Sequence, residues 1–162
     1  MSRLKKAKQK AVVVAVVEKC KATAYIERKV TMSKPIKGSC CCGEITYAAK
    51  ASQPLWYCHC QQCRKMTGHH MAAAQVKLDD IEVNGEAKWY YVSDSSRHGF
   101  CANCGSQMFW RNDNNDFLSI TGGSIDEAPK LHVAGHVFVG EKGDYYEISS
   151  DEKRYICWDS SN

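Results

Sequence analysis

The sequence predicts a mostly-β fold of short strands that follows a basic N-terminal extension. Short runs of apolar and β-branched residues recur about every ten residues after Thr31, and turn residues separate them. No long segment of helical period interrupts this pattern. Seven of the ten cysteines also form three short clusters, so metal ions could tie distant strands together.

The expected strands lie between clear turn signals. Asn84-Gly85 is typical of a hairpin turn, and four Asp and Asn residues at 113–116 also indicate a turn. We expect Trp56, Trp89 and Trp110 in the core. Residues 155–158 are expected to form a terminal strand or a packed tail, with Cys157 as a core residue. The other expected strands are 44–48, 55–57, 71–76, 81–83, 89–92, 108–110, 117–120 and 132–139.

Charge separates the N-terminal segment from the rest of the 162-residue chain, whose length suits one domain. Residues 1–37 carry 11 Lys/Arg and 2 Asp/Glu, and residues 38–162 carry 11 Lys/Arg and 16 Asp/Glu. The net charge of +4 is therefore the sum of +9 and −5. We expect no nucleic-acid binding except through the basic segment, and no membrane span, since no apolar run reaches about 18 residues.

We interpret residues 1–31 as a basic extension, helical or disordered, outside a folded domain of residues 32–162. Its lysines precede an apolar run at 11–17, an order also found in secretory signals. That run is short, and charged residues separate it from Ala22-Thr23-Ala24, which resembles a cleavage site. A transit peptide and a start at Met32 are the other interpretations. Cys20 has no assigned role.

The cysteine spacing favours zinc over disulfides. Cys-x-Cys pairs hold thiols too close together for easy mutual bridging, and the Cys-x-x-Cys pair at 101–104 repeats the spacing of metal-binding knuckles. Thiolate ligands imply a reducing compartment, so we expect a cytoplasmic protein. The seven candidate metal ligands are Cys40, Cys42, Cys58, Cys60, Cys63, Cys101 and Cys104.

Two zinc ions per chain would divide the seven ligands as four plus three. Cys40, Cys42, Cys101 and Cys104 can close a structural site, which needs four protein ligands. Cys58, Cys60 and Cys63 would leave the fourth position open, as a catalytic zinc requires. Two alternatives stay open at this point: His59, His69 or His70 could complete a structural site, or the three thiols could form a redox group without metal.

Four blocks of residues lie in order between 35 and 139, and together they resemble one known family. The family is the glutathione-dependent formaldehyde-activating family, which is grouped with the centromere protein V domain. The blocks are Gly38-Ser39-Cys40-x-Cys42-Gly43, Cys58-His59-Cys60-x-x-Cys63-Arg64-x-x-Thr67-Gly68, Phe100-Cys101-x-x-Cys104-Gly105-Ser106 and Gly122-Gly123-Ser124-Ile125-Asp126.

This resemblance implies a β-tent fold of antiparallel sheets with a structural and a catalytic zinc. It also implies a carbon–sulfur lyase that reversibly joins formaldehyde to glutathione, giving S-hydroxymethylglutathione. The chain departs from the family in the extra Cys41, the basic N-terminus and His69-His70, where small or apolar residues are expected. These departures concern the substrate more than the metal sites.

The expected chemistry is addition of a thiol to an aldehyde at the three-cysteine site, with glutathione or another small thiol and a small aldehyde as partners. Zinc would lower the pKa of the thiol below about 8.5, so a thiolate nucleophile forms at neutral pH. Arg64 could pair with a glutathione carboxylate, and His69 or His70 could transfer a proton. The alternative classes are a glutathione carrier without turnover and a non-catalytic zinc module that binds a protein or chromatin partner.

Overall fold

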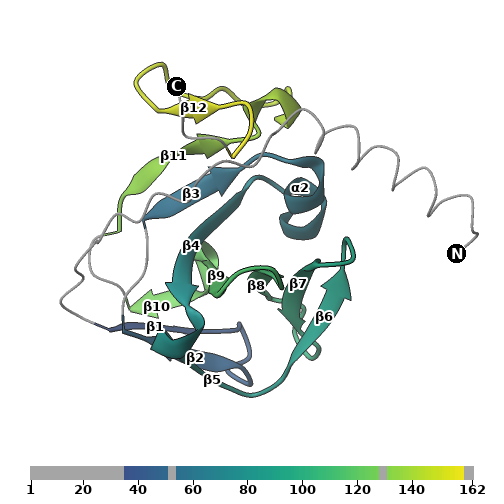
Figure 1. The fold of residues 1–162 in the computed structure, drawn as a ribbon, viewed down its shortest axis with the longest axis vertical. Helices are drawn as coiled ribbons and strands as arrows, with labels where there is room; N and C mark the ends of the chain where they lie inside the picture. Colours follow the sequence, from purple (N-terminus) through teal and green to yellow (C-terminus); the bar gives the residue numbers. More distant parts are fainter. Residues whose placement is uncertain (1–34, 51–53, 128–130, 159–162) are drawn as a thin grey trace, which may run out of the picture.

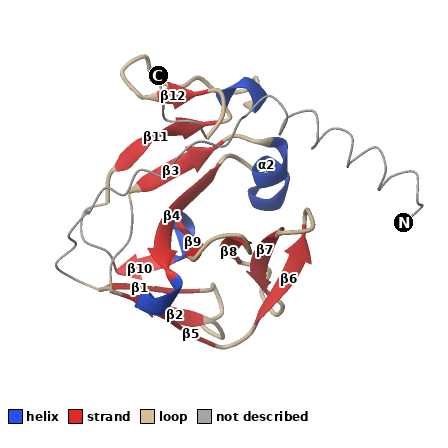
Figure 2. Ribbon diagram, viewed as in Figure 1, coloured by secondary structure: helices blue, strands red, loops and turns tan. Residues whose placement is uncertain are grey.

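The computed structural model describes residues 35–50, 54–127 and 131–158. The expected N-terminal extension lies outside these residues. In the described part, β-strands dominate and form two sheets (Figures 1 and 2). The predicted mostly-β fold of antiparallel sheets is therefore confirmed. No helix of the described residues has both the length and the apolar character needed to cross a membrane.

The smaller sheet has four antiparallel strands. Its central strands pair through a short turn, with Lys37 opposite Ala48 and Gly38 opposite Tyr47. In spatial order the strands are β10 (Ile125–Glu127), β1 (Ile36–Ser39), β2 (Thr46–Ala49) and β5 (Ile81–Asn84).

The larger sheet has eight strands and curves from β12 at the top of Figure 1 to β6 at the lower right. All its neighbours are antiparallel except β11, which is parallel to both β3 and β12. In spatial order the strands are β12 (Arg154–Tyr155), β11 (Val133–Val137), β3 (Leu55–Cys58), β4 (Met71–Lys77), β9 (Phe117–Thr121), β8 (Gln107–Asn112), β7 (Ser96–Cys101) and β6 (Ala87–Tyr91).

Among the residues that the structure describes, the helices are short and lie in the connections. The helix α2 (Gln61–Thr67) connects β3 to β4 (Figure 2). Three 3₁₀ helices follow strands: η1 (Leu78–Asp80), η2 (Gly122–Ser124) and η3 (Val139–Glu141).

The main core lies between the two sheets. The fully buried Ile36 and Ile45 from the small-sheet region pack against Phe109 and Ile120 of the large sheet. The Tyr47 ring meets the Phe109 ring edge to face, with centroids 5.9 Å apart. This packing fixes how the turn after β1 faces the loop after β7, and both of these connections carry cysteines.

The structure corrects one predicted connection. The strands on either side of Asn84-Gly85 do not form a hairpin, because β5 pairs with β2 and β6 pairs with β7. Asn84-Gly85 instead carries the chain from one sheet to the other. Gly85 has φ +86° there, and a Cβ atom would lie 2.2 Å from the Glu44 carbonyl oxygen.

The three predicted core tryptophans are only partly buried. Trp89 packs against the main core, and Trp110 packs against a second cluster around Cys63. Trp56 instead contacts Trp158 and Tyr155 of the C-terminal tail, with ring centroids 5.5 and 5.8 Å away. These tryptophans border the core and do not fill its centre.

Candidate metal centres

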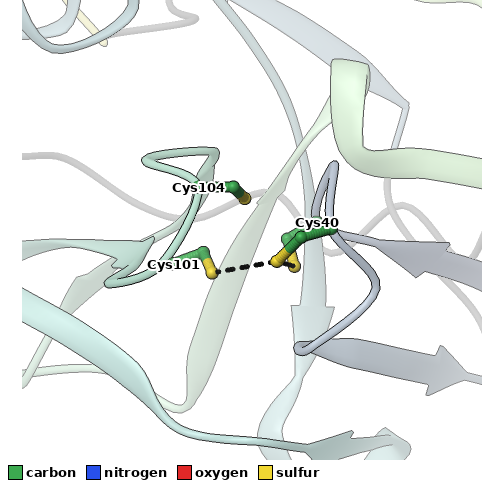
Figure 3. A group of neighbouring side chains, drawn as sticks. Cys40, Cys101 and Cys104 are labelled. Atoms are coloured by element: carbon green, nitrogen blue, oxygen red, sulfur yellow. Dashed lines mark hydrogen bonds between the residues drawn. The ribbon is translucent and has the colours of Figure 1, made fainter.

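The first centre brings four sulfurs together from two connections. Cys40 and Cys42 lie in the turn between β1 and β2, and Cys101 and Cys104 lie at the end of β7 and in the loop after it. All four sulfurs lie within 4.8 Å of one another. Figure 3 shows the side chains of Cys40, Cys101 and Cys104 directed toward a common point.

The spacing of these sulfurs fits a tetrahedral metal. Four sulfurs at about 2.3 Å from a zinc ion would lie about 3.8 Å from one another. The Sγ atom of Cys42 is 3.5 Å from that of Cys40 and 3.7 Å from that of Cys101. A disulfide would need about 2.05 Å, and all four thiols are free. The predicted four-cysteine group is thus present and could hold a metal ion.

Two tight turns, each with a glycine at positive φ, hold the cysteine pairs of this centre. Gly43 and Gly105 both have φ +77°, and each donates its N–H to the carbonyl of a cysteine, Cys40 and Cys101 respectively. A residue with a side chain would be strained in this left-handed conformation. Both turns therefore fold the chain tightly around its pair of sulfurs.

Hydrogen bonds favour the thiolate form of two of the four cysteines, Cys40 and Cys104. The Ile45 N–H donates to the Cys40 sulfur at 3.2 Å, and this bond lowers the pKa of Cys40. The Ser106 hydroxyl lies 3.2 Å from the Cys104 sulfur, and this bond lowers the pKa of Cys104 to about 5. Metal binding requires deprotonated cysteines, so both contacts assist it.

The second centre has three sulfurs from one continuous segment. Cys58 ends β3, Cys60 is the N-cap of α2, and Cys63 lies in the first turn of that helix. The Cys60 sulfur accepts the Cys63 N–H at 3.4 Å, as an N-cap side chain does. Gly68 ends the helix with φ 81°. The cap therefore turns the chain so that all three sulfurs lie within 4.8 Å.

The three cysteines of this centre differ in the pKa of their thiols. Hydrogen bonds from Cys58 and Cys63 lower the pKa of Cys60 to about 3. Hydrogen bonding to Cys58 and Cys60, together with burial, raises the pKa of Cys63. A thiolate therefore forms first at Cys60, and a bound cation would be needed to deprotonate the other two.

No fourth ligand atom joins this centre among the Cys, His, Asp and Glu side chains that the structure describes. His59 lies between two of the cysteines, but its Nδ1 bonds to the Tyr146 hydroxyl and its Nε2 to His136 Nδ1. The Nδ1 atom of His69 bonds to the Tyr145 hydroxyl at 2.8 Å. None of the three histidines considered from the sequence completes the site.

A cluster of histidines and tyrosines, with two buried histidines, lies beside the three-cysteine centre. His59 and His136 are almost fully buried, and Glu152 lies 3.4 Å from His136 Nε2. Burial is the main cause that lowers the pKa of His59 to about 4. Sequence reasoning missed His136, Tyr145, Tyr146 and Glu152, because no motif marks them. The parallel pairing of β11 with β3 places His136 here, and the other three lie in the segment between η3 and β12.

Three other residues considered from the sequence, Arg64, Cys41 and Cys157, differ in burial and in their bonding partners. Arg64 is half-buried on α2, and its Nε atom is buried without a hydrogen-bond partner in the described residues. Cys41 is an exposed free thiol outside both sulfur groups. Cys157, which we expected in the core, is half-buried and disulfide-bonded.

A cavity of about 380 Å³ adjoins the three-cysteine centre. Met71 lines this cavity and also packs against Cys63 in the second hydrophobic cluster. Thr67, another lining residue, donates its hydroxyl to the Cys63 carbonyl at 2.8 Å. The full lining comprises Met66, Thr67, His70, Met71, Ala72, Gly105, Gln107, Thr121 and Gly123.

Fold and site together define a mostly-β protein with two cysteine groups that could each hold a metal ion. Residues 35–141 match the family described as glutathione-dependent formaldehyde-activating enzyme. The chain belongs to this family, as its four sequence blocks indicated.

Comparisons with solved structures and with curated proteins add little to the family assignment. A crystal structure of a Rhodobacter sphaeroides protein is similar with a TM-score of 0.47 and 22% identity, over 57% of this chain and 90% of that one. A comparison with curated proteins finds no match.

Proposed function

We propose that this chain is a zinc-dependent carbon–sulfur lyase that reversibly joins a small thiol, such as glutathione, to a small aldehyde, such as formaldehyde. The observation that carries the proposal is the contrast between the two centres. One has four sulfurs, and the other has three with no fourth ligand atom in the described residues. Family membership supports glutathione and formaldehyde as the substrate pair.

Each centre would hold one zinc ion, so we propose two per chain. Cys40, Cys42, Cys101 and Cys104 would enclose the structural ion. Cys58, Cys60 and Cys63 would hold the second and leave one position for the sulfur of the substrate. When bound there, zinc supplies positive charge that keeps this sulfur deprotonated near neutral pH.

The reaction balances without an oxidant or reductant. The thiol sulfur forms a bond to the carbonyl carbon, the carbon–oxygen double bond becomes single, and the thiol proton finishes on the oxygen. The product is a hemithioacetal, which for formaldehyde is an S-hydroxymethyl thiol. Holding thiol and aldehyde in one site makes this bimolecular addition effectively unimolecular.

Arg64 and His69 are proposed to assist. Arg64 would pair with a carboxylate of glutathione, since it directly follows Cys63 on α2 and carries a planar guanidinium group suited to carboxylates. His69 would exchange the transferred proton with solvent, since its Nδ1 bonds to the hydroxyl of Tyr145, a residue that is 62% exposed.

The test compares Cys60→Ser with Cys41→Ser. Adduct formation by the zinc-loaded protein is measured with glutathione and formaldehyde, and zinc X-ray absorption is recorded with and without glutathione. We expect Cys60→Ser to lose turnover, and Cys41→Ser to match the native protein because Cys41 belongs to neither centre. In the native protein, glutathione should add one sulfur at the three-cysteine centre, so the average over the two zinc ions should rise by about half a sulfur per zinc.

An unchanged zinc environment on adding thiol would contradict the open site. It would favour a non-catalytic zinc module. A changed environment without turnover would instead indicate a glutathione carrier.

A further inference from the structure

His59 lies between two of the sulfur ligands in sequence, yet its ring is bonded elsewhere. The ring Nδ1 bonds to the Tyr146 hydroxyl, and Nε2 bonds to His136 Nδ1 at 2.8 Å. The side chain is fully buried. Successive side chains of an extended segment point to opposite faces, so the residue between Cys58 and Cys60 faces away from an ion that both would hold. His59 is therefore fixed by protein groups and not by metal.

The sheet fixes Cys58 directly, but Cys60 lies beyond the sheet. Cys58 is the last residue of β3, and it lies opposite Met71 of β4 on one side and Val137 of β11 on the other. Cys60 lies in the connection to α2, which begins one residue later. In this connection the His59 N–H donates to the Val137 carbonyl at 3.0 Å. The contacts of His59 thus continue the hold of β11 past the end of β3.

Residues 136–146 contact this connection at several points, and we name them the clasp. Besides the contacts to His59, the Glu141 carboxylate accepts the Gln61 N–H at 2.8 Å, at the start of α2. Within the clasp, Lys142 Nζ donates to the Tyr146 carbonyl at 2.7 Å and lies 5.2 Å from the centroid of the Tyr146 ring. These contacts hold the tyrosine where its hydroxyl meets the histidine ring.

We propose that His136 and Tyr146 are positioning residues of the three-cysteine centre: through His59 they hold the connection in the conformation that brings the sulfurs together, and they thereby set the metal affinity of this centre. The inference rests on the proposed function, through the metal ion assigned to this centre. A segment that adopts its binding conformation only part of the time binds its ligand more weakly by that fraction. Each hydrogen bond to His59 raises the fraction, because the bond forms only when the ring occupies its site.

The four-sulfur centre provides an internal control. The hydrogen-bond partners of its sulfurs include the Ile45 N–H, the Asn103 side-chain nitrogen and the Ser106 hydroxyl, all outside the clasp. A mutation that destabilises the whole fold would weaken metal binding at both centres. Loss of positioning by the clasp would weaken it at the three-cysteine centre alone. The two affinities measured in one protein therefore separate positioning from general stability.

The first experiment competes a chromophoric zinc chelator against the zinc-loaded full chain, which gives a Kd for each ion. Cys60→Ser, expected to keep only the four-sulfur ion, identifies the two transitions. Tyr146→Phe removes the hydroxyl but keeps the ring, whose centroid lies 5.6 Å from that of His59. We expect this variant to raise the Kd of the three-cysteine ion about three- to tenfold, the factor for one ordinary hydrogen bond. The Kd of the four-sulfur ion should not change.

Tyr145→Phe is the matched control. It also removes one tyrosine hydroxyl from the same segment, but this hydroxyl bonds to His69 Nδ1. We expect both zinc affinities to match those of the native protein. Equal weakening of the three-cysteine ion by Tyr145→Phe and Tyr146→Phe would overturn the proposal.

Two variants test His136 in the same assay. His136→Leu keeps a side chain of moderate size but cannot bond to His59, so the three-cysteine ion should again bind more weakly. His136→Asn should recover part of the affinity, because its amide can donate or accept a hydrogen bond. Recovery by asparagine shows that the hydrogen bond matters and not only the packing. Equal affinities for the leucine and asparagine variants, or parallel weakening of both ions, would overturn the role of His136.

Cobalt in place of zinc gives a spectroscopic readout, since its visible absorption depends on the geometry of its ligands. Tyr146→Phe should change the bands of the three-cysteine cobalt and leave those of the four-sulfur cobalt, recorded separately in Cys60→Ser, unchanged. The two failures are distinguishable. A native chain that holds only one ion would remove the proposed function and this inference together. A native chain that holds two ions, with the same affinities and spectra in Tyr146→Phe and His136→Leu, would remove only this inference.

Discussion

Gly38 lies where β1 passes closest to the carbonyl of Ser124. A Cβ atom here would lie 2.2 Å from that oxygen and 2.3 Å from the Tyr47 ring, both far inside contact distance. We expect Gly38→Ala to lower the free energy of unfolding by about 1–3 kcal/mol, the usual cost of overpacking. Chemical denaturation of the metal-loaded protein measures this change.

The matched control is Gly140→Ala. An added Cβ at Gly140 meets nothing within 4 Å, and no positive φ restricts this position. We expect a change within about 0.5 kcal/mol. Equal destabilisation by the two variants would contradict the steric explanation at Gly38.

The buried side chain of His98 should make the free energy of unfolding depend on pH. This side chain is fully buried on β7, and burial lowers its pKa from 6.5 to about 4. Between these two values the unfolded chain binds the proton and the folded chain does not, so folding stability falls as pH drops from about 6.5 toward 4. Thermal unfolding across this window should give a flatter acid limb for His98→Asn than for the native protein. Parallel limbs would show that His98 does not contribute.

At the scale of elements, α2 depends on a residue with two roles. Cys60 is both a proposed metal ligand and the N-cap whose sulfur accepts the Cys63 N–H. Serine is among the best N-cap residues, whereas alanine cannot cap. We expect both Cys60→Ser and Cys60→Ala to lose the second metal, but Cys60→Ala to be less stable by about 1 kcal/mol.

Denaturation of the two variants, each with zinc at the four-sulfur centre only, measures this difference. Because neither variant is expected to hold metal at the three-cysteine centre, the comparison isolates the contribution of the cap. Equal free energies of unfolding would show that the sulfur contact does not stabilise α2.

The elements also show what sequence reasoning could and could not reach. Strands such as β4 and β9 have clear apolar patterns, and the spacing of cysteines alone separated the two sulfur groups. The helix α2 was missed because seven residues give no readable period and its cap is a cysteine. Strands β1, β7 and β10 were missed as well, since glycine and charged residues interrupt their patterns. The cavity could not be foreseen, because its walls come from separate segments.

At the scale of the whole molecule, the four-sulfur centre connects the two sheets. Cys40 and Cys42 follow β1 of the smaller sheet, whereas Cys101 ends β7 of the larger sheet and Cys104 lies in the loop after it. A metal ion bound there would contribute directly to folding. Cys101→Ser should therefore lower Tm far more than Cys60→Ser. The reason is that the three-cysteine centre lies within one continuous segment and does not join distant parts of the chain.

Stepwise chelation gives a second measurement of this difference. We expect one zinc ion to leave with little change in circular dichroism, and the second to leave together with loss of the β signal. Simultaneous loss of both ions without unfolding would contradict a structural role for the four-sulfur centre.

The parallel pairing of β11 with β3 can form only late in synthesis, after all seven cysteines of the two groups have been made. All seven sulfur ligands precede residue 105, whereas β11 and β12 begin at Val133 and Arg154. A nascent chain that has emerged through β9 already carries every ligand for both ions, before the last strands of the large sheet exist. Pairing β11 with β3 joins segments about 80 residues apart and closes slowly. Under the proposed two-zinc arrangement, ion capture on the ribosome would precede closure of the sheet, and the histidine and tyrosine cluster would form last, around a centre that is already loaded.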